Sequence, residues 1–160
     1  MTLLHPTSLE EAKAYIYTID FSQVIDRMVK KDKWKRSEAL KACEFYKNYL
    51  FLVKKYDDLD AGIPPSEDVD AFWHNHILDT KKYIHDCDVI FGKYLQHYPY
   101  FGIDEKSNTQ DLNRAFEKMQ QLHKKEFGDV VYRVRRLTIR DIINTCAQIV
   151  KELFVKKRLP

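Results

Sequence analysis

The sequence predicts an all-α protein with a single compact domain of about six or seven helices, covering residues 1–160. Glycine and proline are scarce, with 4 and 5 residues, whereas β-sandwiches use many such residues in their turns. Helix-capping patterns recur along the chain, and the apolar residues that follow them have helical spacing. A hydrophobic fraction of 44% is enough for a buried core and argues against disorder.

The first three helices are predicted from their start signals. Ser8 and Glu11 have the spacing of a capping box, which opens a helix to about residue 19. Asp20 or Ser22 can cap a second helix, whose apolar residues recur at helical spacing. Ser37 begins a third, long and rich in aromatic residues, which residues 57–65 stop.

The middle of the chain is predicted as a loop followed by two helices. Gly62 and the Pro64-Pro65 pair break helices, so residues 56–68 form a loop. Ser66 or Asp68 then caps the next helix. Asp79 and Thr80 can cap another, and residues 69–96 are therefore predicted to form two helices that meet near Asp79.

The last third begins with an aromatic-rich loop over residues 97–108. Ser107 with Gln110 has capping-box spacing and predicts a helix to about Lys125, which Phe127-Gly128 ends. Residues 130–139 are β-branched and alternating, but without a partner strand they are predicted to form an extended connector. Residues 138–153 are predicted to form the last helix.

Cysteine usage and hydropathy point to a cytoplasmic protein. The three cysteines are far apart and odd in number, which argues against a disulfide framework. No stretch approaches the roughly 20 apolar residues of a membrane span, and the N-terminus lacks the pattern of a secretory signal. We therefore expect no membrane association.

The most informative segment is DVDAFWHNHILDT, residues 68–80. His74 and His76 are two residues apart, so on a regular helix their side chains point roughly 200° from each other. An unbroken helix cannot direct both to one ion. Asp70 lies four residues before His74 and shares its face, where a carboxylate can orient the imidazole or bind an ion beside it. Local unwinding near Asp79 could turn His76 toward His74.

Histidine and carboxylate residues near this segment predict a transition-metal site. The predicted ligands are His74, His76 and His97, because the aromatic loop that His97 opens can fold back over the motif. Asp70 and Asp86 are predicted as further ligands or orienting carboxylates. A nitrogen and oxygen ligand set suits Zn²⁺ or Fe²⁺. With an open position the ion could support hydrolysis or oxidation of a small-molecule or peptide substrate, or serve a structural role.

A non-enzymatic interaction module is the alternative. Trp73, Ile77, Ile84 and Phe91 have the spacing of a core stripe, and His76 near its border could be a packing residue. The basic C-terminal segment or the aromatic loop could then bind a protein or nucleic acid. The basic and aromatic residues of 132–136 could stack on single-stranded bases, and nucleic-acid binding is expected to be weak and without sequence preference. Converging histidines around a cavity would favour the metal site, and buried histidines the interaction module.

Other chemistry has little support. The sequence has no P-loop, no G-x-G-x-x-G and no G-x-S-x-G pattern, which argues against the usual devices of nucleotide binding and serine hydrolysis. The remaining histidines are predicted to lie on the surface: His5, His85 and His123.

A series of spaced residues resembles the glycine-rich-domain-containing-protein-like family. The pattern D-x-x-W-H-x-H…Y-x-x-D-C is similar to one in its members. It is carried by Asp70, Trp73, His74, His76, Tyr83, Asp86 and Cys87, with Phe91-Gly92 shortly after. The resemblance implies a stand-alone helical domain with a functional site lined by Trp73, Tyr83 and Cys87, and it implies no particular reaction. The sequence departs from plant members at Thr80, where they tend to have the proline that favours a helix start.

Overall fold

The computed structural model describes residues 7–56, 62–98, 100 and 108–135. This part of the chain contains six α-helices and no strand, which confirms the all-α class. The helices are α1 (Leu9–Thr18), α2 (Ser22–Lys30), α3 (Arg36–Lys55), α4 (Glu67–Leu78), α5 (Thr80–Phe91) and α6 (Thr109–Phe127). None of the described helices is long and apolar enough to cross a membrane. The last predicted helix, residues 138–153, lies outside the described residues.

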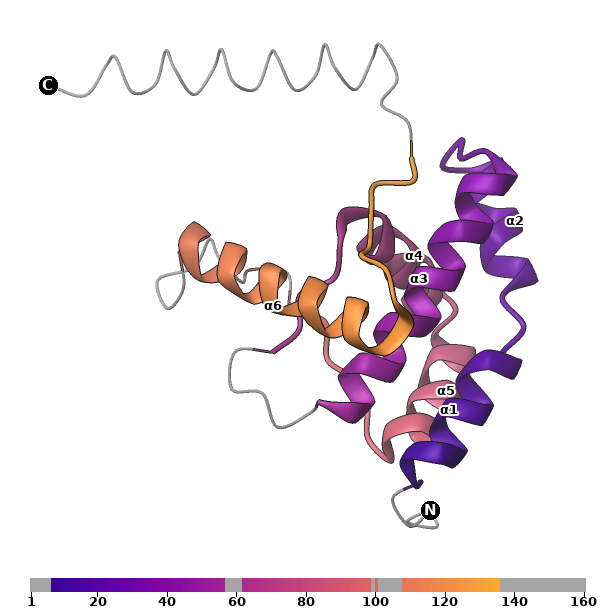
Figure 1. The fold of residues 1–160 in the computed structure, drawn as a ribbon. Helices are drawn as coiled ribbons and strands as arrows, with labels where there is room; N and C mark the ends of the chain where they lie inside the picture. Colours follow the sequence, from indigo (N-terminus) through magenta and orange to yellow (C-terminus); the bar gives the residue numbers. More distant parts are fainter. Residues whose placement is uncertain (1–6, 57–61, 99, 101–107, 136–160) are drawn as a thin grey trace, which may run out of the picture.

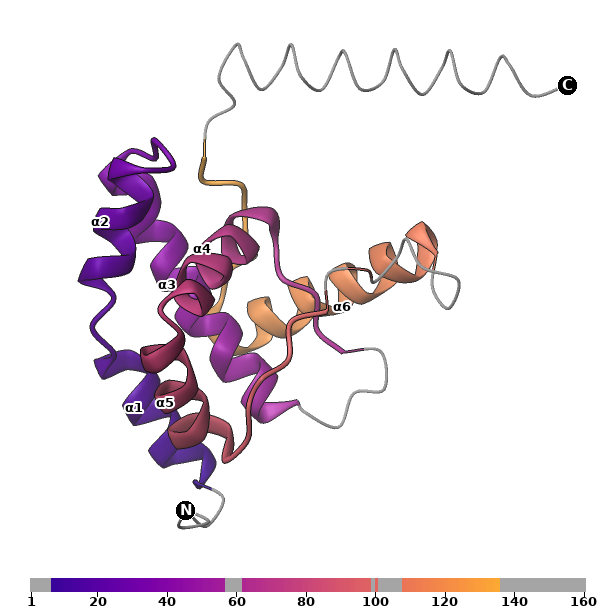
Figure 2. The same ribbon diagram turned by 180° about the vertical axis from the view of Figure 1, so that it is seen from behind.

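Helix α3 is the centre of the fold. Helices α1, α2, α4 and α6 all pack against it, and α5 packs against α1 and α4 (Figure 1). Its side chains Phe45, Tyr46 and Leu50 are buried because neighbours cover it on several sides. The reverse view shows α4 and α5 following each other across the bundle, with α1 beside α5 (Figure 2). Most of the buried apolar residues of the described part of the chain thus form one core around this helix.

Several predicted helix boundaries are confirmed. At the start of α1, the Glu11 backbone N–H donates to the Ser8 hydroxyl and the Ser8 N–H donates to the Glu11 carboxylate, at 3.2 and 3.0 Å. The chain breaks at Asp79, which ends α4 and whose side chain accepts from the N–H of Lys82 in the first turn of α5. Gly128 ends α6 in the left-handed region, with φ of 88°, where a residue without Cβ is least strained.

Other expectations are corrected. The N-cap of α2 is Phe21, which makes no side-chain cap, although Asp20 accepts from the Ser22 N–H. Helix α6 is capped by Asn108 with Asp111 rather than by Ser107 with Gln110. Ile84 is exposed rather than part of the core stripe, because the break at Asp79 changes which face of α5 meets the bundle.

His123 is buried and not on the surface as the sequence predicted. Its Nε2 accepts from the Asn48 amide at 3.1 Å, and its Nδ1 donates to the Asp129 backbone oxygen at 2.8 Å. Asn48 in turn accepts from the Tyr17 hydroxyl at 2.7 Å. A buried imidazole is stable here because α3 supplies a polar partner that sequence spacing does not reveal.

The segment after α6 returns along the bundle and is held there by Asp68. The buried Asp68 carboxylate accepts the backbone N–H groups of Val134 and Arg135. Residues 130–135 form no strand, as predicted for this part of the connector, and residues 136–139 of the predicted connector lie outside the described residues. We call this contact the Asp68 clasp.

Candidate metal centre

Helix α4 directs its two histidines to opposite environments. The His74 side chain is 52% exposed, whereas the His76 side chain is 1% exposed. The helix is continuous through both residues and ends at Leu78, so the angular separation of a regular helix is retained. His74 faces a pocket and His76 faces the interior of the bundle.

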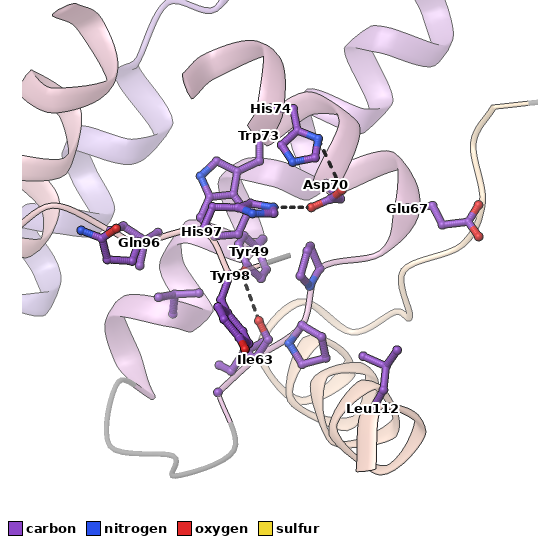
Figure 3. Close-up of a pocket in the computed structure, with 15 residues that line it drawn as sticks. Tyr49, Ile63, Glu67, Asp70, Trp73, His74, Gln96, His97, Tyr98 and Leu112 are labelled. Carbon is purple, nitrogen blue, oxygen red and sulfur yellow. Dashed lines mark hydrogen bonds and ion pairs between the residues drawn. The ribbon is translucent and has the colours of Figure 1, made fainter. Parts of the chain in front are cut away.

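His97 reaches His74 and Asp70 from the segment that follows α5. Its Nε2 donates to the Asp70 carboxylate at 2.7 Å, and its ring centroid lies 4.5 Å from that of His74 (Figure 3). The His74 Nδ1 lies 3.6 Å from the other Asp70 oxygen, slightly beyond a hydrogen bond. Asp70 and His74 share a face of α4 as the sequence predicts, but the Asp70 carboxylate hydrogen-bonds to His97 and not to His74.

These three side chains have the spacing of metal ligands. One nitrogen or oxygen atom from each of Asp70, His74 and His97 lies within 4.8 Å of the others. Ligand atoms bound tetrahedrally to Zn²⁺ at about 2.0 Å are about 3.3 Å apart. The Asp70–His97 and Asp70–His74 distances, 2.7 and 3.6 Å, fall on either side of that value. These two distances end on different Asp70 oxygens, and one ligand atom from each of the three residues could hold a divalent ion.

The cluster opens into a pocket of about 510 Å³. Its walls come from the C-terminal half of α3, residues 62–65, α4, residues 95–98 and the start of α6. Figure 3 shows the His74 and His97 rings turned toward Asp70 at one side, with Leu112 at the far side. A volume of this size is typical of small-molecule sites. An ion bound by the cluster would thus face a space that a ligand can enter.

Trp73 and Tyr83 hold the segment that carries His97. The Tyr83 hydroxyl donates to the Leu95 backbone oxygen at 2.6 Å and accepts from the Trp73 indole N–H at 2.9 Å. Trp73 also packs against the His97 ring, with centroids 4.5 Å apart. Gly92, with φ of 66°, allows the chain to leave α5 and turn back toward α4. The two aromatic residues therefore fix where His97 lies.

Cys87 also packs against the segment that carries His97. The Leu95 backbone and the Tyr83 hydroxyl lie against its thiol. Burial raises the pKa of the Cys87 thiol above its ordinary value, so the thiol is protonated near neutral pH. A buried, protonated thiol suits packing and weak hydrogen bonding better than metal ligation.

His76 and Asp86 form a separate pair inside the bundle. The His76 Nε2 and an Asp86 oxygen lie 3.1 Å apart, but neither atom has a partner in good hydrogen-bond geometry. The His76 Nδ1 pairs with the Tyr46 hydroxyl at 2.9 Å, and Asp86 accepts from the Tyr15 hydroxyl at 2.7 Å. The Lys82 ammonium lies 3.2 Å from Asp86. This group joins α1, α3, α4 and α5.

The charge of Asp86 is stabilised within this group. Burial raises the pKa of its carboxyl, but the nearby His76 ring, the Tyr15 hydroxyl that donates to it and the nearby Lys82 ammonium together outweigh burial and hold the pKa below its ordinary value. The carboxylate is therefore ionised at neutral pH, with the Lys82 ammonium as its nearest full positive charge. Lys82 lies four residues before Asp86 on α5, a spacing that the sequence could have revealed.

The structure thus brings together His74, His97 and Asp70 of the predicted site residues. Trp73 lines the pocket, and Tyr83 and Cys87 lie behind it against Leu95. It does not bring His76 and Asp86 to the cluster. Sequence reasoning missed Tyr46 and Tyr15, the buried partners of that second pair.

Residues 11–135 match the family described as UCP032817-like. The chain belongs to this family. The matched range contains Asp70, His74 and His97 together with the whole described bundle from residue 11 onward.

A curated relative supports this family-level relationship. Glycine-rich domain-containing protein 1 from Arabidopsis thaliana is 29% identical over 85 residues, which cover 52% of this chain and 10% of the relative. The UCP032817-like chain described here therefore spans about a tenth of the length of that relative. No solved structure matches the chain.

Proposed function

We propose that this protein binds a divalent transition-metal ion, zinc or iron, through Asp70, His74 and His97. The observation that carries the proposal is the convergence of one carboxylate and two imidazoles within 4.8 Å at the wall of a pocket. Asp70 and His74 lie on α4, whereas His97 lies 27 residues after Asp70. The fold, and not a short sequence motif, therefore brings the three residues together.

The donor set fits such an ion. Two imidazole nitrogens and one carboxylate oxygen occur at catalytic zinc sites and at non-haem iron sites, where further coordination positions stay open. A bound ion would act on a molecule in the pocket as a Lewis acid or through a bound water. The Asp70–His97 hydrogen bond brings two of the ligands together, and a bound ion would take the place of the proton between them.

The described part of the basic segment makes several contacts within the molecule. Arg133 pairs with Glu67 at 3.0 Å, and Arg135 lies over the Trp34 ring at 5.4 Å. The Tyr132 ring packs edge-on against Phe45. These contacts do not favour a nucleic-acid surface built on these residues, because the contacts within the molecule and a bound nucleic acid would compete for the same side chains.

Metal titration of the protein purified without a polyhistidine tag tests the proposal. We expect one Zn²⁺ or one Fe²⁺, the latter under anaerobic conditions, to bind per chain. His74→Ala and His97→Ala should each weaken binding at least tenfold. His85→Ala is the matched control, because His85 is an exposed histidine outside the cluster. Failure of the wild-type protein to bind either ion stoichiometrically would overturn the proposal.

A further inference from the structure

The pocket beside the metal cluster is polar at one side and apolar elsewhere. Asp70, His74 and His97 lie together on one wall. Facing and flanking them are Val53, Ile63, Pro64, Leu95 and Leu112, with the rings of Tyr49, Trp73 and Tyr98. The Tyr49 hydroxyl is already used, because it donates to the Ile63 backbone oxygen at 2.9 Å. A ligand that fills this space would bury mostly apolar surface.

The charges around the pocket select for an anionic group at the metal. A divalent ion held by one carboxylate and two neutral imidazoles keeps a surplus of one positive charge. Among the described lining residues there is no lysine or arginine, so an anion would find its positive partner only at the ion. Glu67 on the rim does not offset this surplus, because its side chain is 77% exposed and pairs with Arg133.

We propose that the pocket binds a monocarboxylic acid with an apolar body, such as an aryl-alkyl acid, whose carboxylate coordinates the bound metal. The inference rests on the proposed metal site and adds the chemical class of its ligand. A carboxylate neutralises the surplus charge of the site, and an apolar body of moderate size occupies the remaining volume of about 510 Å³. The aromatic walls favour a ring in that body, because aromatic rings gain from edge and offset packing.

The test measures binding of 4-phenylbutyrate and its neutral analogue 4-phenylbutanamide by isothermal titration calorimetry. We expect zinc-loaded protein to bind the acid at least tenfold more tightly than the amide. Metal-free protein should bind both weakly and without preference, because it lacks a cation at the pocket. Acetate should bind zinc-loaded protein at least tenfold less tightly than 4-phenylbutyrate, because it has almost no apolar body.

Variants of Leu112 test binding of the acid in the pocket separately from binding of zinc. Leu112→Ala removes apolar surface from the far wall without adding a charge, and should weaken binding of the acid severalfold while leaving zinc affinity unchanged. Leu112→Met conserves volume and should retain both.

Each contrary outcome has a distinct meaning. Zinc binding without a preference for the acid over the amide would overturn this inference alone. Equally tight binding of the acid by metal-free protein would also overturn it, because the metal would then not be the anchor. If zinc itself does not bind, both this inference and the proposed function are overturned.

Discussion

The Tyr83 hydroxyl donates a hydrogen bond of 2.6 Å to the backbone oxygen of Leu95, two residues before His97. This bond joins the first turn of α5 to the segment that supplies one of the three candidate ligands. Tyr83 is therefore a positioning residue for the metal cluster, although it is not one of the described residues that line the pocket. Its effect on metal binding can be measured apart from its effect on stability.

Tyr83→Phe should weaken zinc binding about tenfold, because the segment carrying His97 loses its anchor while the ring still fills its place. The variant also leaves the Trp73 indole N–H without its acceptor, which should lower the free energy of unfolding by about 1–2 kcal/mol. Zinc titration and urea denaturation measure the two effects. Tyr94→Phe is the control, because Tyr94 is exposed in the same region. Unchanged zinc affinity in Tyr83→Phe would contradict the positioning role.

The two histidines of α4 should have opposite phenotypes. His74→Ala should abolish most zinc binding and change the free energy of unfolding of metal-free protein by less than about 0.5 kcal/mol, because His74 is on the surface. His76→Ala should lower that free energy by about 3 kcal/mol, because it leaves the buried Asp86 carboxylate without one of its partners. The folded fraction of His76→Ala should still bind zinc. Loss of zinc binding from the folded His76→Ala protein would place His76 in the metal site.

Asp86 should make the protein sensitive to acid. Its pKa lies below the ordinary value of 3.8, so the stabilisation from its ionised form is fully present above about pH 4 and is lost as the pH falls below that value. Asp86→Asn should lower the Tm at pH 7, and the difference from wild type should shrink toward pH 3. Asp88→Asn, at an exposed position of the same helix, should show no such pattern. A difference in Tm for Asp86→Asn that is constant from pH 7 to pH 3 would argue against this role.

Cys43 and Cys87 should resist alkylation in the folded protein. Burial raises the pKa of the Cys43 thiol to about 11 and holds that of Cys87 above its ordinary value, so few thiolates exist near neutral pH. Both thiols are also covered by the core. Peptide mapping after iodoacetamide treatment should find both residues unmodified in native protein and modified in urea. Rapid native labelling of either residue would mean that the core around it opens readily.

The sequence predicted best those features of the fold that depend on a few neighbouring residues. Helix caps located the start of α1 and the break at Asp79, because they depend on a few adjacent residues. Helical geometry alone separated His74 from His76, and the structure places them on opposite faces of α4. The face shared by Asp70 and His74 follows from the same periodicity.

What the sequence did not reveal depends on contacts between distant residues. Asp70 hydrogen-bonds to His97, 27 residues later, and this pairing leaves His74 slightly too far for a hydrogen bond. His76 meets Asp86 only because the chain turns at Asp79 and stacks α5 beside α4. His123 is buried because α3 brings Asn48 to it from 75 residues away. No local pattern encodes these distances.

The Asp68 clasp sets a limit on how far the chain can be shortened from its C-terminal side. A fragment that stops between residues 128 and 133 would retain every described helix, yet the buried Asp68 carboxylate would lose both backbone donors. The smallest autonomous fragment should therefore extend at least through Arg135, where the family match also ends. Excision of this unit from a longer polypeptide should respect the same boundary.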